Sequence, residues 1–375
     1  MSIESNNPSL RRVLVSAGGT GGHIFPGLAL VQALQAAGID VSWVGCDRQL
    51  DKRLVSPILP LHPLPMQAWR GRGLMGRFRS VVSLLRSCWQ SWRYLRRFSP
   101  DVVVTFGGYV TVPVGLMARV LRIPLVIHEQ NCVAGSANRL LASHAQARMT
   151  AFPNALPNAR VSGNPLRAGF DSLAERAVPR EHDGVLRVLV MGGSLGAAPI
   201  NDAVVDMMAA WDNHDSSIEL RHQTGESDYK RIQDAYGDKP VTVLPFIHDV
   251  LEALQWADVV IARSGALTVS EIAAVGVASI LIPYPKAIDD HQFVNAMLLG
   301  DAGAAMVLRE DTLSGSRLGS ILMTLATDPG RCQAMALAAA NTYQPDAVGS
   351  LMKVCAEVSH RDLPAQESVL SEGES

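Results

Sequence analysis

Short apolar runs, rich in β-branched residues, alternate along the chain with longer stretches of helical character. Strands that alternate with helices are typical of βαβ units and predict parallel sheets. Because the runs are apolar at successive positions, we expect strands that are covered on both faces. The predicted fold class is therefore α/β. The expected strands are Val13–Val15, Val41–Val44, Val102–Phe106, Leu125–His128, Val188–Met191, Ile218–His222, Val241–Leu244, Val259–Ala262 and Ser279–Ile282.

Two similar glycine turns follow two of these runs, a domain length apart. The first reads Gly18-Gly-Thr-Gly-Gly-His23, and the second reads Gly192-Gly-Ser-Leu-Gly196. Glycine lets a ligand approach the main chain closely, and the start of the following helix offers unpaired N–H groups to an anion. The repetition predicts two Rossmann-like domains with parallel sheets that face a central cleft, each turn facing it.

Composition narrows the class of protein. A chain of 375 residues predicts about two domains, and a hydrophobic content of 48% suffices for two cores. The net charge of −2 argues against a nucleic-acid partner. The five cysteines form no CxxC pair, which argues against a disulfide framework or a cysteine zinc site; they are Cys46, Cys88, Cys132, Cys332 and Cys355.

The expected location is cytosolic. The first residues lack the basic and apolar regions of a secretory signal, and no apolar run approaches the roughly 18 residues that would span a bilayer.

Domain limits follow from turn-rich and polar segments. We expect an N-terminal domain over 1–167 and a C-terminal domain over 168–345, with the linker around Gly163–Gly184. A last helix at about 346–360 is expected to pack back on the first domain. Residues 361–375 are acidic, rich in serine and without periodicity, which predicts a disordered tail.

Polar and glycine residues concentrate where the predicted strands end. In open α/β sheets, ligands bind beyond the carboxyl ends of the strands, so these segments are expected to carry the chemistry. They are Gly18–His23, Gly107–Tyr109, His128–Asn131, Gly192–Gly196, Arg263–Ala266 and Pro283–Gln292.

Taken in order, several segments resemble the signatures of the MurG family of UDP-N-acetylglucosamine transferases. They are Gly18–His23, Gly107–Tyr109, His128–Asn131, Gly163–Arg167, Gly192–Ala197 and Arg263–Glu271. The likeness runs from about residue 11 to about residue 358. The chain departs from the family pattern at Thr111-Val112, at Cys132 and over Tyr284–Asp290.

The resemblance implies a GT-B glycosyltransferase with the nucleotide sugar mainly in the second domain and the acceptor mainly in the first. The implied reaction moves GlcNAc from UDP-GlcNAc, with inversion, to the C4 hydroxyl of MurNAc in undecaprenyl-pyrophosphoryl-MurNAc-pentapeptide. This converts lipid I to lipid II in peptidoglycan biosynthesis, and other cell-wall synthesis proteins are possible partners.

The candidate donor residues combine helix starts with hydrogen-bonding side chains. Ser194 and the amides around it are expected to hold the diphosphate, or serine merely caps its helix. The resemblance implies that Arg167 contacts the diphosphate, where a guanidinium would offset charge on the leaving group; a solvated linker arginine is the alternative. It further assigns uracil to the main chain of Ile247, the GlcNAc to Asn131 and Gln292, and the approach to the nucleotide to Ala266, Leu267, Thr268, Val269 and Ser270.

Glu271 has two interpretations. It closes the sequence Thr268-Val-Ser-Glu271, whose spacing matches a capping box. A carboxylate also accepts two hydrogen bonds, which suits the vicinal hydroxyls of ribose, and the resemblance implies that contact.

His23 is the first candidate for the catalytic base. Inverting transfer needs a group that takes the proton of the acceptor hydroxyl, and histidine titrates in the useful range. The alternative is a histidine that caps a helix or orients the acceptor. Glu129 and His128 are second candidates, and Thr20, Gly21, Gly22 and Tyr109 are expected to line the sugar and acceptor region.

No metal or other cofactor is expected. The chain has no Asp-x-Asp motif, and Asp289-Asp290-His291 is interpreted as a solvated loop rather than a cation site.

A basic stretch over residues 70–97 contains eight arginines and no acidic residue. Its apolar residues recur at helical spacing along one face; they are Phe78, Val82, Leu85, Trp89 and Trp92. Arg79, Arg86 and Arg93 recur every seven residues beside them. Such a helix suits anionic lipid headgroups, which predicts peripheral membrane binding. The resemblance implies that this membrane surface is the cytoplasmic face of the bacterial inner membrane. A core helix with an exposed basic flank is the alternative.

Three other functions remain open. An NAD-dependent oxidoreductase would use the first turn and an acid such as Asp47. A UDP-GlcNAc epimerase would share the nucleotide site. A membrane-docked scaffold or nucleotide sensor would use the basic stretch without catalysis.

Overall fold

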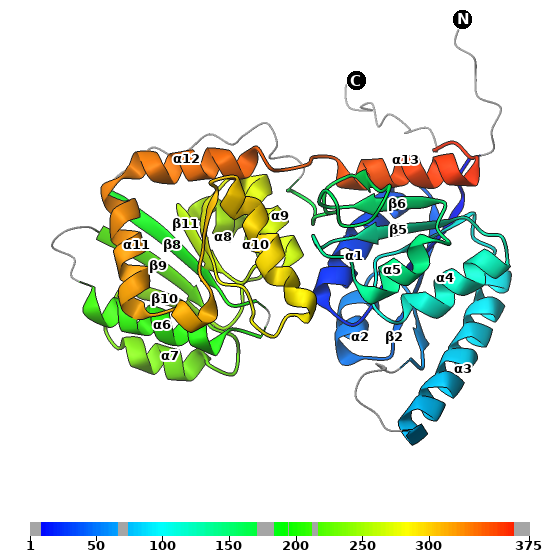
Figure 1. Ribbon diagram of the computed structural model, residues 1–375, viewed down its shortest axis with the longest axis horizontal. Helices are drawn as coiled ribbons and strands as arrows, with labels where there is room; N and C mark the ends of the chain where they lie inside the picture. The colour runs from blue at the N-terminus through cyan, green and yellow to red at the C-terminus, as the bar shows by residue number, and fades with distance from the viewer. Residues whose placement is uncertain (1–8, 67–73, 171–183, 194, 212–216, 364–375) are drawn as a thin grey trace, which may run out of the picture. The chain divides into compact units, whose positions relative to one another are not determined.

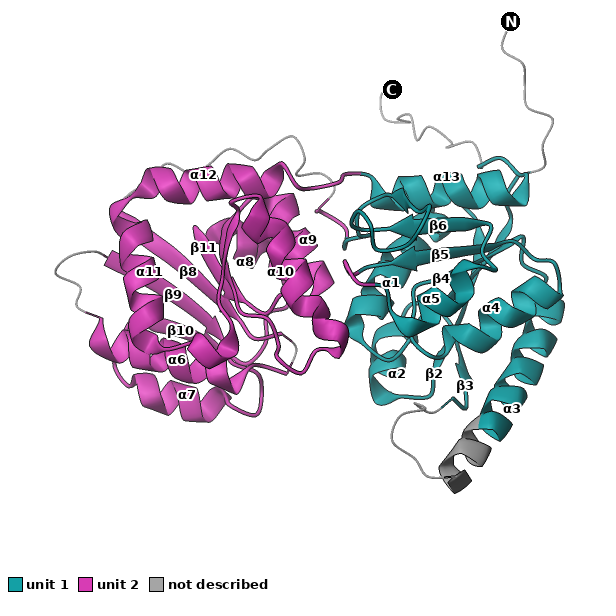
Figure 2. Cartoon of the chain, in the orientation of Figure 1, with its two compact units in different colours: residues 1–130, 134–167, 346–375 teal, residues 131–133, 168–345 magenta. Residues whose placement is uncertain are grey.

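The computed structural model describes residues 9–66, 74–170, 184–193, 195–211 and 217–363, with the backbone alone for 74–80. The chain divides into two compact units (Figure 2). Unit 1 comprises residues 1–130, 134–167 and 346–375, and unit 2 comprises 131–133 and 168–345. Three residues of the expected first domain, Asn131–Val133, thus belong to unit 2.

Unit 1 is built on a seven-stranded parallel sheet of order β3-β2-β1-β4-β5-β6-β7 (Figure 1). The order reverses between β1 and β4, which lie side by side, and ligands bind at such switch points in open α/β sheets. The strands are β1 (Arg12–Ser16), β2 (Asp40–Cys46), β3 (Leu61–Leu64), β4 (Val102–Thr105), β5 (Leu125–Glu129), β6 (Ala147–Thr150) and β7 (Arg160–Val161).

Successive residues of each strand point to opposite faces of this sheet, and helices cover both faces. Val13 and Val15 pack in a core with α1 and α13, whereas Leu14 packs in a second core with α3, α4 and α5. The helices are α1 (Gly21–Ala36), α2 (Gln49–Val55), α3 (Leu74–Phe98), α4 (Thr111–Val120), α5 (Ser136–Ala142) and α13 (Ala347–Ser359).

The end of the described chain is tied to its beginning. Leu351 and Cys355 of α13 are fully buried in the core of unit 1. Beyond the helix, Arg361 forms an ion pair with Asp101 at 2.9 Å, and the Asp362 carbonyl accepts a hydrogen bond from the Leu10 amide at 2.7 Å. Residues 361–363 are therefore ordered, in contrast to the expected tail, whose remainder lies outside the described residues.

Unit 2 repeats the plan with a six-stranded parallel sheet of order β10-β9-β8-β11-β12-β13. Here the order reverses between β8 and β11. Helices α6, α7 and α11 contribute to the core on one face. The strands are β8 (Val185–Met191), β9 (Ser217–Gln223), β10 (Val241–Leu244), β11 (Val259–Ala262), β12 (Ala278–Leu281) and β13 (Ala305–Val307).

The helical segments of unit 2 connect these strands. The α-helices are α6 (Ala198–Ala210), α7 (Tyr229–Tyr236), α8 (Val250–Trp256), α9 (Ala266–Val275), α10 (His291–Asp301), α11 (Gly315–Thr327) and α12 (Pro329–Ala340). Two short 3₁₀ helices are η2 (Ile288–Asp290) and η3 (Glu310–Thr312). Among the described residues, no helix has both the length and the apolar character that crossing a membrane requires.

The α/β prediction is confirmed, and each predicted strand overlaps an observed one. Four observed strands were not predicted: β3, β6, β7 and β13. They are short and lack a continuous β-branched run; β3 includes Pro63, β6 includes Arg148, and β7 has two residues. Pairing with neighbouring strands, rather than intrinsic pattern, makes these segments extended.

Candidate functional site

In unit 1, two glycine segments meet at the carboxyl ends of β1 and β4. Gly19 and Gly108 have φ values of +93° and +86°, which side chains rarely adopt. A Cβ on Gly108 would collide with the Gly18 carbonyl oxygen, so only glycine allows the two segments to pack together. The predicted first turn and Gly107–Tyr109 thus form one surface at the switch point.

His23 lies at this surface, in the first turn of α1. Its Nδ1 atom is 3.2 Å from Thr20 Oγ1 and 3.3 Å from the Gly18 carbonyl oxygen. A carbonyl oxygen only accepts, so the contact with Gly18 fits an imidazole that donates from Nδ1 and keeps its lone pair on Nε2. A Cβ on Gly107 would lie 3.3 Å from that Nε2 atom. The geometry therefore fits a base at Nε2.

Asp51 supports the first turn from beneath. The residue is fully buried, and its carboxyl accepts hydrogen bonds from the backbone of Gly19 and of Cys46, at 3.0 Å from the Cys46 nitrogen. Burial raises the pKa of Asp51 above its ordinary value, although these hydrogen bonds oppose the rise. No motif predicts this role, because the contact with Gly19 joins α2 to a turn some thirty residues earlier.

Tyr109 and Asp47 lie near the same turn with different roles. Tyr109 is half-buried, and the Arg48 guanidinium lies 5.4 Å from its ring centroid. Burial raises the pKa of Tyr109 to about 12, so its hydroxyl stays protonated. Asp47 is exposed and pairs with Lys52 at 2.6 Å. That surface pair leaves little support for Asp47 as a ribose ligand.

The buried end of β5 holds the loop that follows it. Gln130 Nε2 is 2.9 Å from His128 Nδ1, and His128 Nε2 is 3.0 Å from the Gly163 carbonyl oxygen. Because the amide nitrogen of Gln130 donates and the carbonyl accepts, His128 carries its proton on Nε2. Burial lowers the pKa of His128 to about 4, so the ring is neutral near pH 7.

Glu129 contacts that loop directly. Its Oε2 atom accepts hydrogen bonds from the Gly135 amide at 3.0 Å and from Asn138 Nδ2 at 2.8 Å. Glu129 as a whole is 1% exposed. These contacts favour support of the loop, and a catalytic role for Glu129 stays a prediction.

Arg167, the last residue of its segment in unit 1, lies against α1. Its guanidinium carbon is 4.7 Å from the centroid of the Phe25 ring. Phe25 follows His23 by two residues on the same helix, so the chain fold brings this arginine to the helix that carries the candidate base.

In unit 2, the second turn links β8 to α6. Gly193 and Gly196 have φ values of +83° and +76°, and the Gly196 amide donates to the Gly193 carbonyl at 2.9 Å. A Cβ on Gly196 would collide with the Thr224 carbonyl oxygen, so the turn packs tightly on the residues that follow β9. Ser194 lies outside the described residues, and its diphosphate contact stays a prediction.

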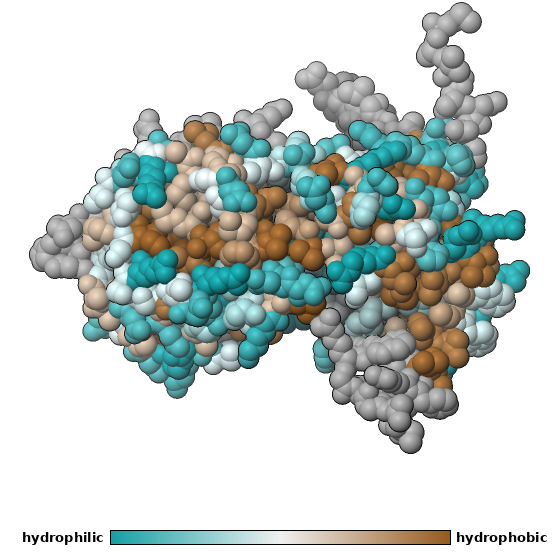
Figure 3. Space-filling view, viewed as in Figure 1, coloured by the Kyte–Doolittle hydropathy of each residue, from teal (hydrophilic) through white to brown (hydrophobic). Residues whose placement is uncertain are grey.

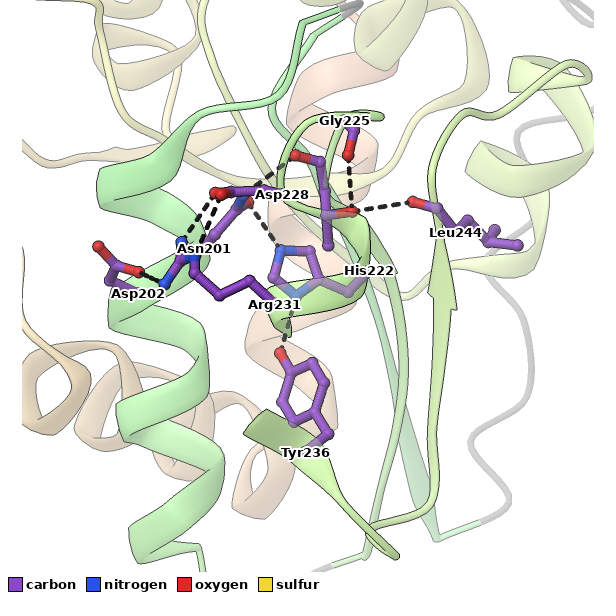
Figure 4. Close-up of polar contacts among 9 residues, drawn as sticks. Asn201, Asp202, His222, Gly225, Asp228, Arg231, Tyr236 and Leu244 are labelled. Carbon is purple, nitrogen blue, oxygen red and sulfur yellow. Dashed lines mark hydrogen bonds and ion pairs between the residues drawn. The ribbon is translucent and has the colours of Figure 1, made fainter. Parts of the chain in front are cut away.

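A chain of buried hydrogen bonds fixes that Thr224 carbonyl (Figure 4). Asn201 Nδ2 donates to the Thr224 carbonyl at 3.0 Å and to Asp228 Oδ2 at 2.8 Å. The Asn201 oxygen therefore accepts from His222 Nε2 at 3.1 Å, and His222 Nδ1 accepts from the Tyr236 hydroxyl at 2.7 Å. Burial lowers the pKa of His222 to about 4, which keeps this arrangement of protons near pH 7.

The predicted nucleotide segment opens α9. Gly265 is the N-cap and Ala266 begins the helix, so Glu271 lies in the second turn. The capping-box interpretation of Glu271 is therefore wrong, because the partner residue would have to be the N-cap. Glu271, Val269 and Ser270 are buried, whereas Leu267 and Thr268 are half-buried. Ile247, between β10 and α8, is also half-buried.

Asn295 of α10, which sequence reasoning missed, connects the predicted segments that contain Asn131 and Ser264. It is fully buried, and its Nδ2 atom contacts Asn131 Oδ1 at 3.2 Å and the Ser264 carbonyl at 3.3 Å. Its oxygen accepts from the Cys132 amide at 2.9 Å. A lone asparagine on an apolar helix face was its only signal in the sequence.

Gln292 precedes Asn295 by one helical turn. Its Oε1 atom accepts from the Tyr284 amide at 2.9 Å, and its carbonyl accepts from Ser264 Oγ at 2.8 Å. The structure thus brings Gln292 and Asn131 to the start of α9, through Ser264 and Asn295.

The acidic pair Asp289-Asp290 does not form a cluster of ligands. Asp290 forms an ion pair with Arg309 at 2.9 Å. Over the part of the chain that the structure describes, no group of three His, Cys, Asp or Glu side chains could hold a metal ion.

The fold and these turns are those of glycosyltransferases. Residues 13–150 match the glycosyltransferase family 28 N-terminal domain, and residues 187–351 match the family 28 C-terminal domain. A solved structure of UDP-GlcNAc 2-epimerase from Neisseria meningitidis, 14% identical, superposes with a TM-score of 0.64 over 92% of this chain and 100% of the other, which shows a shared fold alone.

More similar proteins narrow the family. The chain is 43% identical over 350 residues to the UDP-N-acetylglucosamine–N-acetylmuramyl-(pentapeptide) pyrophosphoryl-undecaprenol N-acetylglucosamine transferase of Polynucleobacter asymbioticus, covering 92% of this chain and 97% of the relative. The crystal structure of Acinetobacter baumannii MurG is 34% identical, with a TM-score of 0.81 over 92% and 99% of the two chains. The chain belongs to glycosyltransferase family 28 and, within it, to the MurG transferases. Its fold is GT-B, and the oxidoreductase alternative is wrong.

Proposed function

We propose that this chain transfers GlcNAc from UDP-GlcNAc to the C4 hydroxyl of MurNAc in undecaprenyl-pyrophosphoryl-MurNAc-pentapeptide, the step from lipid I to lipid II. The observation that carries the proposal is the pair of glycine turns at two switch points, in a chain 43% identical to such a transferase over 92% of its length. Each unit contributes one half of the reaction.

Unit 2 holds the donor. The amides of the second turn and the start of α6 bind the diphosphate, because helix starts carry partial positive charge. Glu271 accepts from the ribose hydroxyls, the main chain at Ile247 meets uracil, and Gln292 with Asn131 contacts the sugar. Leu267 and Thr268 are the parts of the α9 start that are not fully buried, which supports an approach of the nucleotide there.

Unit 1 holds the acceptor and the base. His23 takes the hydroxyl proton at Nε2 while its Nδ1–H is held by the Gly18 carbonyl. Thr20, Gly21 and Gly22 line the path of the acceptor sugar and phosphate, with Tyr109 beside them. Arg167, which packs against Phe25 on the helix that carries His23, offsets charge on the UDP leaving group.

The direct test measures UDP release from UDP-GlcNAc with and without a soluble-tailed lipid I analogue. Release that requires the analogue supports a transferase; release without it supports an epimerase-like or hydrolytic reaction. UDP-GlcNAc binding without any turnover would support a nucleotide sensor instead.

We further infer that the reaction needs no metal. The best candidate carboxylate, Asp290, is engaged by Arg309, while the helix starts and Arg167 supply positive charge for the diphosphate. Turnover should be equal in EDTA and in Mg²⁺. A loss of turnover in EDTA that Mg²⁺ restores would contradict this inference.

Helix α3 supports docking of unit 1 on an anionic membrane. Part of its exposed surface is apolar, with Leu85 64% and Trp89 56% exposed, whereas Ser87 and Ser91 are buried. Val81 and Val82 extend this surface, and hydrophobic residues gather over α3 on the face that Figure 3 presents. A core helix would bury its apolar side, so this inverted arrangement favours a surface that meets lipid.

Exposed arginines flank that surface. Arg93 lies 4.9 Å from the Trp89 ring centroid. Arg86 lies about one helical turn before Trp89 and two turns before Arg93. Each basic residue near an anionic surface contributes on the order of 1 kcal/mol, enough together for reversible binding. The predicted contributions of Phe78 and Arg79 rest on side chains outside the described residues. The expected location is the cytoplasmic face of the bacterial inner membrane.

Vesicle sedimentation tests this docking. The double variant Arg86→Glu/Arg93→Glu should bind phosphatidylglycerol vesicles at least about tenfold more weakly than the native chain. A matched double reversal on unit 2, Arg317→Glu/Arg331→Glu, should bind as the native chain does. Equal loss in both variants, or in neither, would contradict a role for α3.

A further inference from the structure

Gln223 is the last residue of β9, and it lies between the two segments that are expected to hold the nucleotide. In the sheet it pairs with Met191 of β8 on one side and with Leu244 of β10 on the other. Gly192 follows Met191 and opens the second glycine turn, and Pro245 follows Leu244 and leads to Ile247. Gln223 itself is 4% exposed, so it does not present its side chain to solvent.

The side-chain amide of Gln223 bonds to both segments. Its oxygen accepts from the Gly192 amide at 3.2 Å, and its nitrogen donates to the Gly193 carbonyl at 3.0 Å. The same nitrogen contacts the Pro245 carbonyl at 3.4 Å. The backbone pairing of β8, β9 and β10 ends at this level of the sheet. The side chain of Gln223 therefore supplies the hydrogen-bond partners that further strand pairing would have supplied.

These contacts need an acceptor and two donors on one short group. Glutamine has both, whereas glutamate lacks the donors and methionine of similar length has only a weak sulfur acceptor. A buried carbonyl or amide that loses its partner bears a cost of desolvation, so the two segments would relax away from this arrangement. The end of the turn at Gly196 already packs against the Thr224 carbonyl, which accepts a hydrogen bond from Asn201 (Figure 4).

We propose that Gln223 is a positioning residue that fixes the second glycine turn and the segment before Ile247 at the spacing required by a nucleoside diphosphate. It acts through the backbone of Gly192, Gly193 and Pro245 and does not touch the ligand. This role depends on the proposed function, because it assumes that the second turn binds diphosphate and the β10–α8 segment binds the base. A site that is already arranged loses less conformational freedom when the nucleotide binds.

The test replaces Gln223 with methionine and measures UDP binding by calorimetry and transfer kinetics with the soluble-tailed lipid I analogue. Gln223→Met should raise the dissociation constant for UDP and the KM for UDP-GlcNAc by about tenfold. The KM for the acceptor should stay at the native value. Val204→Ala is the matched control, because Val204 is fully buried in the core of the same unit, in α6, eight residues beyond Gly196. It should lower the melting temperature and leave UDP binding unchanged.

The outcomes separate this role from the function on which it depends. Weaker UDP binding in Gln223→Met but not in Val204→Ala supports positioning, whether or not the native chain transfers sugar. Equal UDP binding by the native chain and Gln223→Met overturns it, even if transfer is confirmed. Weaker binding in both variants by the same factor also overturns it, since general destabilisation would explain the loss. A native chain that does not bind UDP would contradict both proposals.

Discussion

The two glycine turns have the same backbone plan but different supports. In unit 1 the buried carboxyl of Asp51 accepts from Gly19, whereas in unit 2 the neutral amide of Gln223 bonds to Gly192 and Gly193. A neutral support suits the turn of unit 2, which is proposed to bind the donor diphosphate, because a buried negative charge would repel that ligand. The turn of unit 1 is proposed to meet the acceptor sugar and phosphate, and burial raises the pKa of the Asp51 carboxyl that supports it, which disfavours the charged form of that carboxyl. The comparison teaches that the repeat of the fold fixes the turns, while the side chain that supports each turn differs between the units.

The largest effect is expected at His23, the proposed catalytic base in unit 1. His23→Gln should lower kcat by between about 10²- and 10⁴-fold, because it removes the proton acceptor, and should leave the KM for UDP-GlcNAc near the native value. Steady-state kinetics with the lipid I analogue measure both constants. A loss in kcat smaller than tenfold would assign proton transfer to another group and weaken the division between the units.

A second effect, on stability, should be shared by both units. Burial lowers the pKa values of His128 and His222 from 6.5 to about 4, so the unfolded chain binds protons in this interval that the folded chain does not. Stability is therefore complete above pH 6.5 and is lost as pH falls toward 4, by up to about 3 kcal/mol for each histidine.

Urea unfolding at pH 7.5 and at pH 5 measures this loss, with His222→Gln as the comparison. The variant should be less stable than the native chain at pH 7.5, and the difference in the free energy of unfolding should shrink at pH 5. A difference that stays constant across this range would mean that His222 is not neutral in the fold.

At the proposed donor site of unit 2, Glu271→Ala should raise the KM for UDP-GlcNAc by about 10- to 100-fold, because it removes the carboxyl that we propose accepts hydrogen bonds from the ribose hydroxyls. The acceptor KM should not change. Glu252→Ala on α8 of the same unit is the control, since Glu252 is exposed and pairs with Arg221. Unaltered kinetics in Glu271→Ala would remove ribose binding from this residue.

The smallest effect exchanges the support of the acceptor turn. Asp51→Asn keeps an acceptor for the amides of Gly19 and Cys46 but removes a carboxyl whose pKa is raised by burial. A raised pKa means that ionisation disfavours the fold, so the variant should gain stability relative to the native chain as pH rises from 4 to 7. Urea unfolding across that range measures the gain, and a parallel pH dependence of both chains would contradict it.

The sequence predicted the parts of the fold that have strong local patterns. The apolar runs and both glycine turns lie where expected, because each is encoded within a few neighbouring residues. Asp51, Gln223 and Asn295 were missed, because they bond to the backbone of Gly19, Gly192 and Cys132, which the fold brings near. A side chain that bonds to a backbone segment distant in the sequence leaves no local sequence motif.

Helix α3 shows the limit of reading amphipathicity. Its basic character and apolar stripe were evident, but a stripe of Leu85 and Trp89 ordinarily faces a core. The structure places Ser87 and Ser91 inward instead, beside the fully buried Leu95. Which side of a helix packs depends on its neighbours, and the sequence of the helix alone did not contain that information.

The return of α13 to unit 1 has a consequence for biosynthesis. Translation makes every segment of unit 2 before it reaches Leu351 and Cys355, which complete the core of unit 1. Although unit 1 begins the chain, it is the later of the two to possess all of its parts. A chain truncated near residue 346 would therefore carry every segment of unit 2 together with a unit 1 whose apolar interior lies open to chaperones and proteases.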